Sequence, residues 1–570
     1  MHCMQRRPVS PAWLAMFAIV VLSPAFAADV ACDDPAPTPP QSGICSVTAG
    51  DDGRLLRGTV LLPDGVATNG SVMVDVNGTI VCAGCGCQAA EGAETATRID
   101  CANGVISPGL IDLRNQITFT QNVPTADTGE RYEHRHDWRL GQNSHTQISV
   151  ASGATTAQLR WGELRDLISG VTAMNSGTGG VAGFVRNLGR TSAFHGLDGA
   201  STDYETFPLN DAAGFTTDTG CDAGYTLPSA PVDGRFAFVA AEGINAAARN
   251  EFLCLSGLEE GGVDVLGNAS VAGAIALRAS DAAALAAHDA SVIWQPRDDL
   301  RLYGMTAPVT VFDNAGVPLA LATVWTPTGS MSLQREMRCA DSYNATYLDH
   351  HFSDEALWRM ATQNAAVAAG FGGEIGRLAP TLKADVAVFD ASSRSGYRAV
   401  VGADVADVVL VLRSGLPMYG EAAVLSALGA GEGVCDPIEV CGSQRRVCVT
   451  RETGQTLALL TNAVGASTYP LFFCGEPVDE PVCKPQRLQG APNNVAPFFT
   501  GDPITNDGDG DGVPDTSDVC PTMFDPPRPA DGSVQPDEDH DGIGDACDPC
   551  PLDADNACDT LFKDGFDAVE

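Results

Sequence analysis

The stretch VISPGLIDLRNQ, residues 105–116, decides the fold prediction. It opens with a short, mainly apolar run, and five more such runs follow along the chain with helical segments between them. Strands that alternate with helices are typical of parallel βα units. We therefore expect an α/β fold built around a TIM-like (β/α)8 barrel. The six runs are residues 105–111, 171–175, 236–242, 271–277, 291–295 and 317–324.

A small β-unit is expected on both sides of these runs. Asn77-Gly78 suits the positive φ angles of a type I′ turn, and residues 71–76 and 79–82 on either side have the character of two hairpin strands. Residues 373–420 return to strands. The barrel is therefore predicted to be inserted into a small sheet that both ends of the domain build.

The composition limits the possible partners. The chain has 570 residues, 44% of them hydrophobic, which is enough for two or more domains with apolar cores. Its 72 acidic residues against 33 Lys and Arg give a net charge of −39. Because nucleic-acid binding depends on Lys and Arg, we expect no nucleic-acid partner. This negative charge favours cations as binding partners.

Residues 1–27 have the pattern of a secretory signal peptide. Arg6 and Arg7 precede an apolar stretch over 13–22, and Ala25-Phe26-Ala27 provides small residues at the cleavage point. We expect the signal to be removed and the mature chain to be periplasmic or extracellular. No later stretch has the roughly 18 consecutive apolar residues of a spanning helix, so no membrane span is predicted.

The cysteines agree with export. Of the 19, only Cys3 lies in the signal, and the remaining 18 are an even number. Cysteines in an oxidising compartment form disulfides, so we expect most of the 18 to be paired. The sequence does not give their connectivity.

The acidic residues of the C-terminal tail are regularly spaced. The pattern D-x-D-x-D-G-x-x-D occurs twice, with Gly512 and Gly542 at the same place. Alternate carboxylates in such a loop converge on one centre, and Ca²⁺ takes about six to eight oxygen ligands. The alternative is a solvated acidic tail without a ligand. The expected calcium ligands are Asp507, Asp509, Asp511 and Asp515 in the first copy and Asp537, Asp539, Asp541 and Asp545 in the second.

The tail resembles thrombospondin type 3 repeats. The likeness is carried by DGDGDGVPDTSDVCP (507–521) and DEDHDGIGDACDPCP (537–551). It implies that Asp518 and Asp548 are calcium ligands as well. The segment is too poor in apolar residues to form a core, so calcium and the tail cysteines are expected to supply its order.

The phrase SPGLID (107–112) resembles the amidohydrolase superfamily, in which it leads from the first barrel strand into a His-x-His metal pair. Further phrases agree with this family: ERYEHRHDWR (130–139), WQPRDDLRLY (294–303) and Lys383-Ala384-Asp385. The resemblance covers about residues 54–484. It implies a metal-dependent barrel hydrolase that opens C–N bonds or deaminates, with a β-sandwich made from both ends of the domain.

The transition-metal ligands of this family are replaced here. At the family's proton-shuttle position Glu242 is retained. A Lewis-acidic metal needs several His and carboxylate ligands, so a transition-metal cofactor is doubtful. A guanidinium is expected to pair with Glu242 where the metal would lie. The five ligand positions carry Arg114, Gln116, Val239, Gly273 and Val324.

His134 and His136 are the alternative transition-metal ligands. They lie two residues apart on a segment expected to be extended, with Asp137 beside them. A His pair without a third ligand is weak support for a metal site. The other interpretation is a hydrogen-bonded loop near the barrel mouth.

Three functions stay open at this point. The first is a secreted, catalytically degenerate barrel with a binding or structural role, with an unknown small molecule or surface as partner. The second is a hydrolase of cyclic amides or amidines, and the third is calcium-dependent attachment through the tail. The predicted segments are the signal (1–27), a Pro-rich leader (28–53), first sandwich part (54–104), barrel (105–380), sandwich return (381–434), Cys-rich segment (435–489), linker (490–505), calcium-binding repeats (506–560) and C-terminal tail (561–570).

Overall fold

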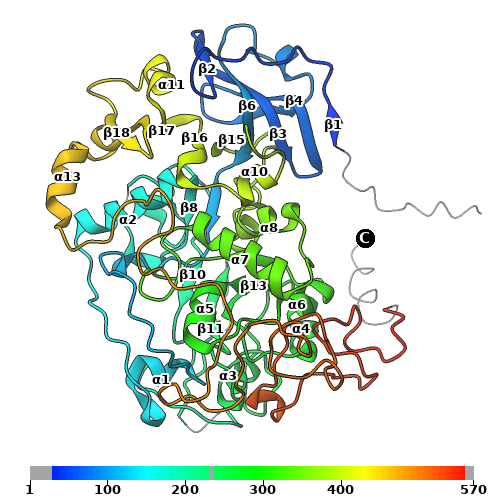
Figure 1. Cartoon of the computed structure of the whole chain (residues 1–570). Coiled ribbons are helices and arrows are strands. Elements are labelled where there is room, and N and C mark those ends of the chain that lie inside the picture. The colour runs from blue at the N-terminus through cyan, green and yellow to red at the C-terminus, as the bar shows by residue number, and fades with distance from the viewer. Residues whose placement is uncertain (1–28, 182, 222–223, 230–234, 559–570) are drawn as a thin grey trace, which may run out of the picture.

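The computed structural model describes residues 29–181, 183–221, 224–229 and 235–558 (Figure 1). The signal peptide predicted over 1–27 and the tail predicted over 561–570 lie outside the described residues. An apolar sheet lies at the top of the view, the parallel strands and most helices lie below it, and the acidic tail lies at the lower right beside α4 and α6.

Eleven strands of the described chain form one sheet, in the order β1-β4-β3-β6-β15-β16-β17-β19-β18, with β2 beside β6 and β5 beside β4. The antiparallel β4–β5 pair is the hairpin predicted around Asn77-Gly78. The strands are β1 (Val30–Ala31), β2 (Ser46–Thr48), β3 (Asp51–Leu62), β4 (Gly65–Val74), β5 (Ile80–Gly84), β6 (Ala96–Pro108), β15 (Val386–Asp390), β16 (Val408–Arg413), β17 (Leu416–Glu421), β18 (Asp436–Val440) and β19 (Ser443–Val447).

Chain ends far apart in sequence meet in this sheet. The antiparallel pairing of β6 with β15 places Ile106 opposite Val388, and both side chains are fully buried. The strands β18 and β19 extend the same sheet beyond β17, so the first part of the Cys-rich segment is continuous with it.

Parallel strands form the second part of the fold. In the described residues β7, β8 and β9 make a three-stranded parallel sheet and β10 to β14 a five-stranded one, both in chain order. This confirms the α/β prediction with parallel strands. The sequence missed β9 and β10, which are too short to give an apolar run. The strands are β7 (Leu110–Asp112), β8 (Val171–Met174), β9 (Arg186–Asn187), β10 (Asp203–Glu205), β11 (Phe236–Ala240), β12 (Ser270–Gly273), β13 (Ser291–Trp294) and β14 (Leu319–Leu321).

The expectation of one strand over 105–111 is wrong. The chain leaves the large sheet at Pro108 and enters the parallel sheet at Leu110, so Gly109 is the crossing point. A Cβ on Gly109 would lie 2.2 Å from Thr172 Oγ1, which is closer than side chains approach. Only glycine lets the two sheets come together here.

The helices surround the parallel strands (Figure 1). Several helices begin at a polar N-cap whose side chain accepts a hydrogen bond from a free backbone N–H group; α2, for example, begins with the reciprocal hydrogen bonds of Thr155 and Gln158. The α-helices are α1 (Arg135–Leu140), α2 (Thr156–Ile168), α3 (Ala246–Leu255), α4 (Ala279–Ala287), α5 (Pro296–Tyr303), α6 (Val309–Asn314), α7 (Leu333–Tyr347), α8 (Asp354–Met360), α9 (Gln363–Ala368), α10 (Arg398–Val401), α11 (Ala422–Ala427), α12 (Val449–Thr453) and α13 (Leu457–Val464).

Every one of the 18 cysteines within residues 29–558 forms a disulfide, as predicted for most of them. The many disulfides fit an extracellular or periplasmic protein. In the described chain, no helix is both long enough and apolar enough to cross a membrane. The pairs are Cys32–Cys85, Cys45–Cys101, Cys82–Cys87, Cys221–Cys254, Cys339–Cys483, Cys435–Cys448, Cys441–Cys474, Cys520–Cys547 and Cys550–Cys558.

Replacing Gly109 with alanine tests the crossing point. We expect G109A to lower the free energy of unfolding by about 1–3 kcal/mol, because its Cβ overlaps the Thr172 side chain. G373A is the matched control, since a Cβ on the exposed Gly373 meets no atom within 4 Å, and its effect should stay within about 0.5 kcal/mol. Denaturant unfolding measures both, and equal stability of the two variants would contradict the steric argument.

Candidate functional site

A buried ion pair lies at the carboxyl ends of the parallel strands. Arg114 follows β7 and Glu242 follows β11, and their Nη2 and Oε2 atoms are 3.5 Å apart. The two side chains are only 4% and 3% exposed. Arg114 Nη1 also donates to Gln295 Oε1 at 2.5 Å, and Tyr303 OH donates to Glu242 Oε1 at 3.0 Å. The pairing expected from the sequence is therefore present.

The charges around Arg114 hold it in its ionised form. Burial alone would lower the pKa of Arg114, but Tyr204, Glu242 and the acids of α5 raise that pKa above its ordinary value. Because a guanidinium does not lose its proton, the strand ends carry one fixed positive charge.

Two acids of α5, Asp298 and Asp299, have raised pKa values. Burial, and then the charge of Glu242, raises the pKa of Asp298 to about 7. Burial, and then the charge of Asp298, raises the pKa of Asp299 well above its ordinary value. Asp299 accepts hydrogen bonds from Gln295 Nε2 at 3.1 Å and Thr306 Oγ1 at 2.8 Å. These hydrogen bonds join Asp299 to the same network as Arg114, through Gln295.

The five positions at which the resemblance implies metal ligands lie toward one end of the parallel strands. Val324 N donates to Arg114 O at 2.9 Å, and Gln116 N donates to Val324 O at 2.7 Å. A Cβ on Gly273 would lie 2.9 Å from Glu242 Cβ, so the end of β12 lies against Glu242. Val239 lies within β11, with its side chain buried in an apolar cluster. The residues at these positions are one arginine, one glutamine, two valines and one glycine.

His134 and His136 lie beside this network in a second buried group. His134 Nε2 is 3.2 Å from Glu251 Oε1, and His136 Nε2 is 2.9 Å from Asp211 Oδ2. Together with Glu251, the two His offer ligand atoms within 4.8 Å of one another. The sequence did not indicate Glu251 or Asp211, because only the fold brings α3 and the loop before β11 to the His pair.

Cations and donors already occupy this second group. Arg135 Nη2 is 2.5 Å from Asp211 Oδ2 and 3.1 Å from Glu251 Oε1. His134 Nδ1 accepts from the backbone N–H of His136 at 3.1 Å. With Nδ1 accepting, a neutral imidazole carries its proton on Nε2, which lies 3.2 Å from Glu251 Oε1 without forming a hydrogen bond in the described chain. A metal at this atom would have to displace that proton.

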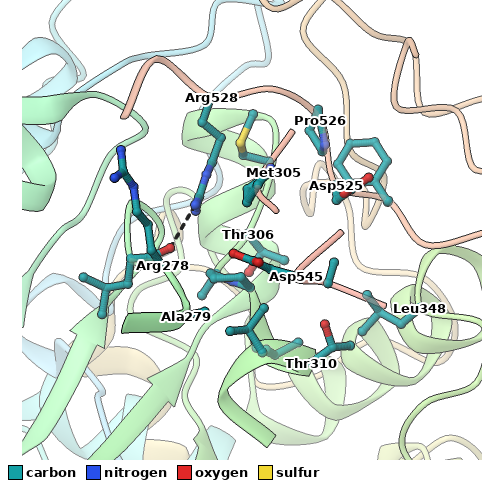
Figure 2. A pocket seen from close by; sticks show the side chains of 18 of the residues that line it. Arg278, Ala279, Met305, Thr306, Thr310, Leu348, Asp525, Pro526, Arg528 and Asp545 are labelled. Carbon is teal, nitrogen blue, oxygen red and sulfur yellow. Dashed lines mark hydrogen bonds between the residues drawn. The ribbon is translucent and has the colours of Figure 1, made fainter. Parts of the chain in front are cut away.

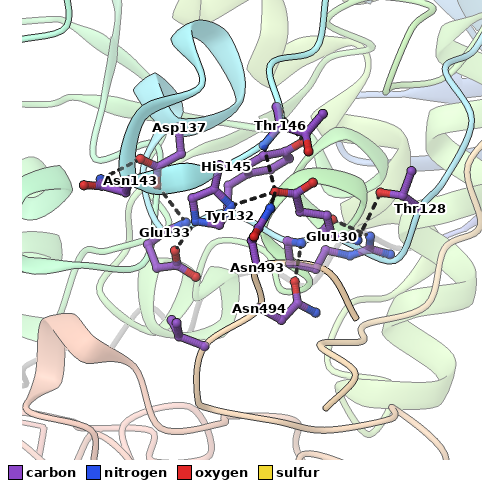
Figure 3. A network of polar contacts seen from close by, with 12 residues as sticks. Thr128, Glu130, Tyr132, Glu133, Asp137, Asn143, His145, Thr146, Asn493 and Asn494 are labelled. Carbon is purple, nitrogen blue, oxygen red and sulfur yellow. Dashed lines mark hydrogen bonds and ion pairs between the residues drawn. The ribbon is translucent and has the colours of Figure 1, made fainter. Parts of the chain in front are cut away.

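A third polar network, which sequence reasoning missed, lies in the loop around His145. The His145 ring lies between two carboxylates: Nδ1 is 3.0 Å from Glu130 Oε1, and Nε2 is 2.7 Å from Glu133 Oε2 (Figure 3). Asn493 Nδ2 donates to Glu130 Oε1 at 2.8 Å. Burial would lower the pKa of His145, but the hydrogen bond and charge of Glu133 raise it. Arg487 of the predicted Cys-rich segment also pairs with Glu133, so this segment and Asn493 of the predicted linker are both fixed to the same loop.

The acidic tail contains two carboxylate clusters. Asp509, Asp511, Asp518 and Asp525 offer oxygens within 4.8 Å of one another, and so do Asp537, Asp539 and Asp541. The sequence missed Asp525, which lies outside both copies of the repeat pattern. Of the other predicted ligands, Asp507 accepts from Gly510 N at 2.7 Å and Asp515 accepts from Gly508 N at 2.7 Å, so both shape the first loop.

The carboxylates of the first cluster lack a positive partner. Asp509 is 1% exposed and Asp525 8% exposed, and the Oδ2 atom of each is buried with no hydrogen-bond partner. Gln535 Nε2 alone faces Asp511, Asp518 and Asp525, at 3.2, 2.8 and 2.8 Å. Burial, then neighbouring like charges, raises the pKa of Asp509 to about 7 and that of Asp511 to about 8.

Buried oxygens without partners also mark the second repeat. Asp545 and Asp548 are 3% and 0% exposed, and the Oδ2 atom of each has no hydrogen-bond partner. Burial raises the pKa of Asp545 to about 7. These carboxylates fit a hard cation with oxygen ligands, which would supply the missing positive charge.

The tail packs directly on the part of the molecule that holds the parallel strands. Arg528 donates to the backbone oxygens of Ile275 and Leu277, at the loop after β12, and Asp531 pairs with Arg278 at 2.8 Å. A cavity of about 50 Å³ remains in this seam, with Asp545 and Pro526 of the tail facing Met305 and Thr310 (Figure 2). The tail is therefore part of the folded body.

No protein-family model matches the chain, and no curated protein matches it. Among solved structures, an adenosine deaminase from Xanthomonas campestris with bound zinc is 16% identical, with a TM-score of 0.46 over 72% of this chain and 96% of that one. Atrazine chlorohydrolase TrzN from Arthrobacter aurescens TC1 with zinc is 14% identical, with a TM-score of 0.47 over 73% and 99%.

A third neighbour is the aminofutalosine deaminase of Helicobacter pylori, 14% identical with a TM-score of 0.43 over 64% of this chain and 99% of that one. These neighbours are deaminases and hydrolases of the amidohydrolase type. At such identity the likeness concerns the fold alone.

The pKa of Asp298 gives a test of the buried network. The pKa of Asp298 is about 7 in the folded chain, against an ordinary value of 3.8 for the unfolded chain. Between these two pH values the folded chain binds more protons than the unfolded chain. Ionisation of Asp298 therefore lowers the stability of the fold as pH rises. In D298N that contribution disappears, while Trp325 Nε1 keeps an oxygen acceptor. We expect the loss of stability between pH 5 and 8 to be about 2–3 kcal/mol smaller in D298N than in wild type.

Unfolding by denaturant at pH 5 and pH 8, with calcium present, measures this difference. D313N is the matched control, because the Asp313 carboxylate is half-exposed and pairs with His351 on the surface. Identical pH dependence in wild type and D298N would mean that Asp298 is ionised throughout.

Proposed function

We propose that the chain is an exported, calcium-binding protein whose amidohydrolase-like barrel is a binding module and not a metal-dependent hydrolase. The ion pair of Arg114 with Glu242 carries this proposal. It puts a permanent cation at the strand ends, where the resemblance implies a divalent metal. Two cations this close would repel each other strongly in a buried site.

The loss of hydrolysis follows from the donor set. A metal that generates hydroxide near neutral pH needs several His and carboxylate ligands and one open position. The five positions supply Arg114, Gln116 and three residues without donors in their side chains. Glu242, the remaining carboxylate, is held by Arg114 and Tyr303, so it is not free to act as a proton shuttle.

A closed barrel is the architecture that we infer for the eight parallel strands. Backbone hydrogen bonds support this inference, because they join the three-stranded sheet to the five-stranded sheet at both edges. Thr202 N donates to Leu188 O at 3.0 Å between β9 and β10, and the bonds between Val324 and Arg114 join β14 to β7. In such a barrel, ligands bind at the carboxyl ends of the strands.

The alternative hydrolase of cyclic amides or amidines would have to use His134 and His136. Their distances to Glu251 permit a cation, but Arg135 already balances the two carboxylates. The Nε2–H of His134 faces the position that the metal would take. We therefore favour the binding module.

Calcium is the proposed partner of the tail, held by the first cluster with Asp525 and by the second repeat. The ions would neutralise buried carboxylates that have no cationic partner. Calcium-dependent attachment to a surface is a further role of the tail that its acidic composition favours. No nucleic-acid partner is proposed, because the charge is strongly negative.

Metal analysis separates the binding module from the hydrolase. After incubation with Zn²⁺ and dialysis, we expect less than about 0.1 zinc per chain and no hydrolysis of lactams, imidazolones or guanidino compounds, because Arg114 occupies the metal position. Elemental analysis and a product assay measure this. One zinc per chain with hydrolysis that E242Q abolishes would overturn the proposal.

Calcium removal is expected to lower the melting temperature of the whole domain, because the tail packs on the barrel through Arg528 and Asp531. Saturation at 100 times the dissociation constant stabilises the fold by about 2.7 kcal/mol per site. D525N should weaken calcium binding about tenfold or more, measured by isothermal titration. D555N removes the same charge from an exposed tail position outside the clusters and should change nothing. Unchanged calcium binding in D525N would remove Asp525 from the ligand set.

A further inference from the structure

A strap of chain, residues 486–499, packs on the loop formed by residues 128–146 (Figure 3). The two ends of the strap are joined, because Arg487 and Phe499 exchange backbone hydrogen bonds at 3.0 and 3.1 Å. These two are the buried residues of the strap, and the residues between them are exposed or half-buried. With so little apolar burial, the attachment of the strap depends on its polar contacts.

Two side chains of the strap end on carboxylates of the loop. Asn493 Nδ2 donates to Glu130 Oε1 at 2.8 Å, and the Arg487 guanidinium pairs with Glu133 Oε1. Asn494 adds two hydrogen bonds with the backbone of the same loop. Glu130 and Glu133 are therefore the two acids through which the strap is held.

His145 lies between these two acids. Its Nδ1 is 3.0 Å from Glu130 Oε1, its Nε2 is 2.7 Å from Glu133 Oε2, and its side chain is only 2% exposed. An ionised carboxylate only accepts hydrogen bonds, and a neutral imidazole has a single N–H group. The imidazolium has two, so it alone can donate to both acids at once. The geometry therefore calls for a protonated His145.

The other contacts of the two acids do not replace this proton. In the described chain, the further hydrogen-bond partners of Glu130 are neutral N–H groups. Arg487 pairs with Glu133 Oε1, which is not the oxygen that His145 contacts. Loss of one proton from His145 therefore sets a nitrogen lone pair against a carboxylate oxygen, at one of the acids that hold the strap.

A metal ion is a poorer occupant of this group than a proton. Glu133, Asp137 and His145 bring ligand atoms within 4.8 Å of one another. However, Arg487 is already paired with Glu133, and Asp137 accepts hydrogen bonds from two backbone N–H groups and from Asn143 Nδ2. These contacts favour the proton on His145.

The direction of the pH dependence follows from the groups that face His145. Burial would lower its pKa, but Glu133, Glu130 and Asp137 raise it above 6.5. The Tyr132 ring, centred 5.2 Å from that of His145, adds no charge near neutral pH, because burial raises its pKa to about 12. The folded chain thus keeps the proton where the unfolded chain has lost it. The contribution to stability is complete below pH 6.5 and is lost as pH rises above this value.

We propose that the His145 imidazolium is a pH-sensitive latch, which holds the strap on the loop when protonated and releases it when the proton is lost at alkaline pH. The same loop contacts the strand ends, because Arg135 N donates to Glu242 O at 3.0 Å and Ile244 N donates to Glu133 O at 2.8 Å. Release of the strap therefore loosens the loop beside Glu242. The latch goes beyond the proposed function, since it needs neither a ligand nor a metal at the strand ends.

Hydrogen exchange of the strap in the full calcium-loaded chain tests the latch, measured by mass spectrometry on peptides from residues 488–498. H145Q keeps a polar side chain but cannot carry a charge. Wild type and variant are compared at the same pH, so the intrinsic exchange rate cancels. At pH 6 we expect the strap of H145Q to exchange about threefold faster or more than that of wild type, and at pH 9 the two rates should agree within about twofold.

H288Q is the matched control, because it removes a histidine that pairs with Asp264 at the surface. Its strap should exchange like that of wild type at both pH values. Equal exchange of H145Q and wild type at pH 6, or the same ratio of their rates at pH 6 and pH 9, would overturn the latch.

E130Q gives a second test that does not depend on the folding of H145Q. It keeps an acceptor oxygen for Thr146 N and Asn493 Nδ2 but removes a charge that favours the His145 proton. The pH at which the strap loses its protection should move down by about half a pH unit or more. E94Q removes the same charge from an exposed turn and should leave this pH unchanged. The same release pH in E130Q and wild type would contradict the role of His145.

Discussion

The buried Arg114 guanidinium at the strand ends is the constraint on which the surrounding structure depends. A permanent charge with 4% exposure must be neutralised and hydrogen-bonded, because burying it alone would cost several kcal/mol. Glu242 supplies the opposite charge, and Gln295 and Tyr303 satisfy the remaining polar atoms. Burial is the main cause of the raised pKa values of Asp298 and Asp299, and the negative charge of Glu242 at Asp298 and of Asp298 at Asp299 adds to it.

The tail is held together on a different principle. It has carboxylates where a core would need apolar side chains, so folding brings like charges together with their oxygens unpaired. Its two disulfides, Cys520–Cys547 and Cys550–Cys558, shorten the unfolded loops but do not remove that repulsion. Cations at the clusters would remove it. Arg528 attaches the tail to the loop after β12, so repulsion between the carboxylates of the tail also affects the packing of that loop.

The two polar regions illustrate how one fold can hold different chemistry. At the strand ends the buried Arg114 guanidinium is balanced by the Glu242 carboxylate. In the tail, carboxylates without a cationic side chain point to metal ions. The disulfides that connect distant segments, such as Cys339 with Cys483, keep both regions attached to the same body.

The sequence by itself determined the alternation of strands and helices, the repeated acidic loops and the pairing of most cysteines, because spacing and residue type carry these features, whereas the candidate pair of Arg114 with Glu242 came from the resemblance to the amidohydrolase superfamily. Tertiary structure alone decided the break at Gly109, the short strands β9 and β10, the addition of Asp525 to a cluster, and the meeting of Glu251 with His134. The physical reason is that each of these depends on contacts between segments far apart in the chain. Neither local propensity nor spacing records which segments the core brings together.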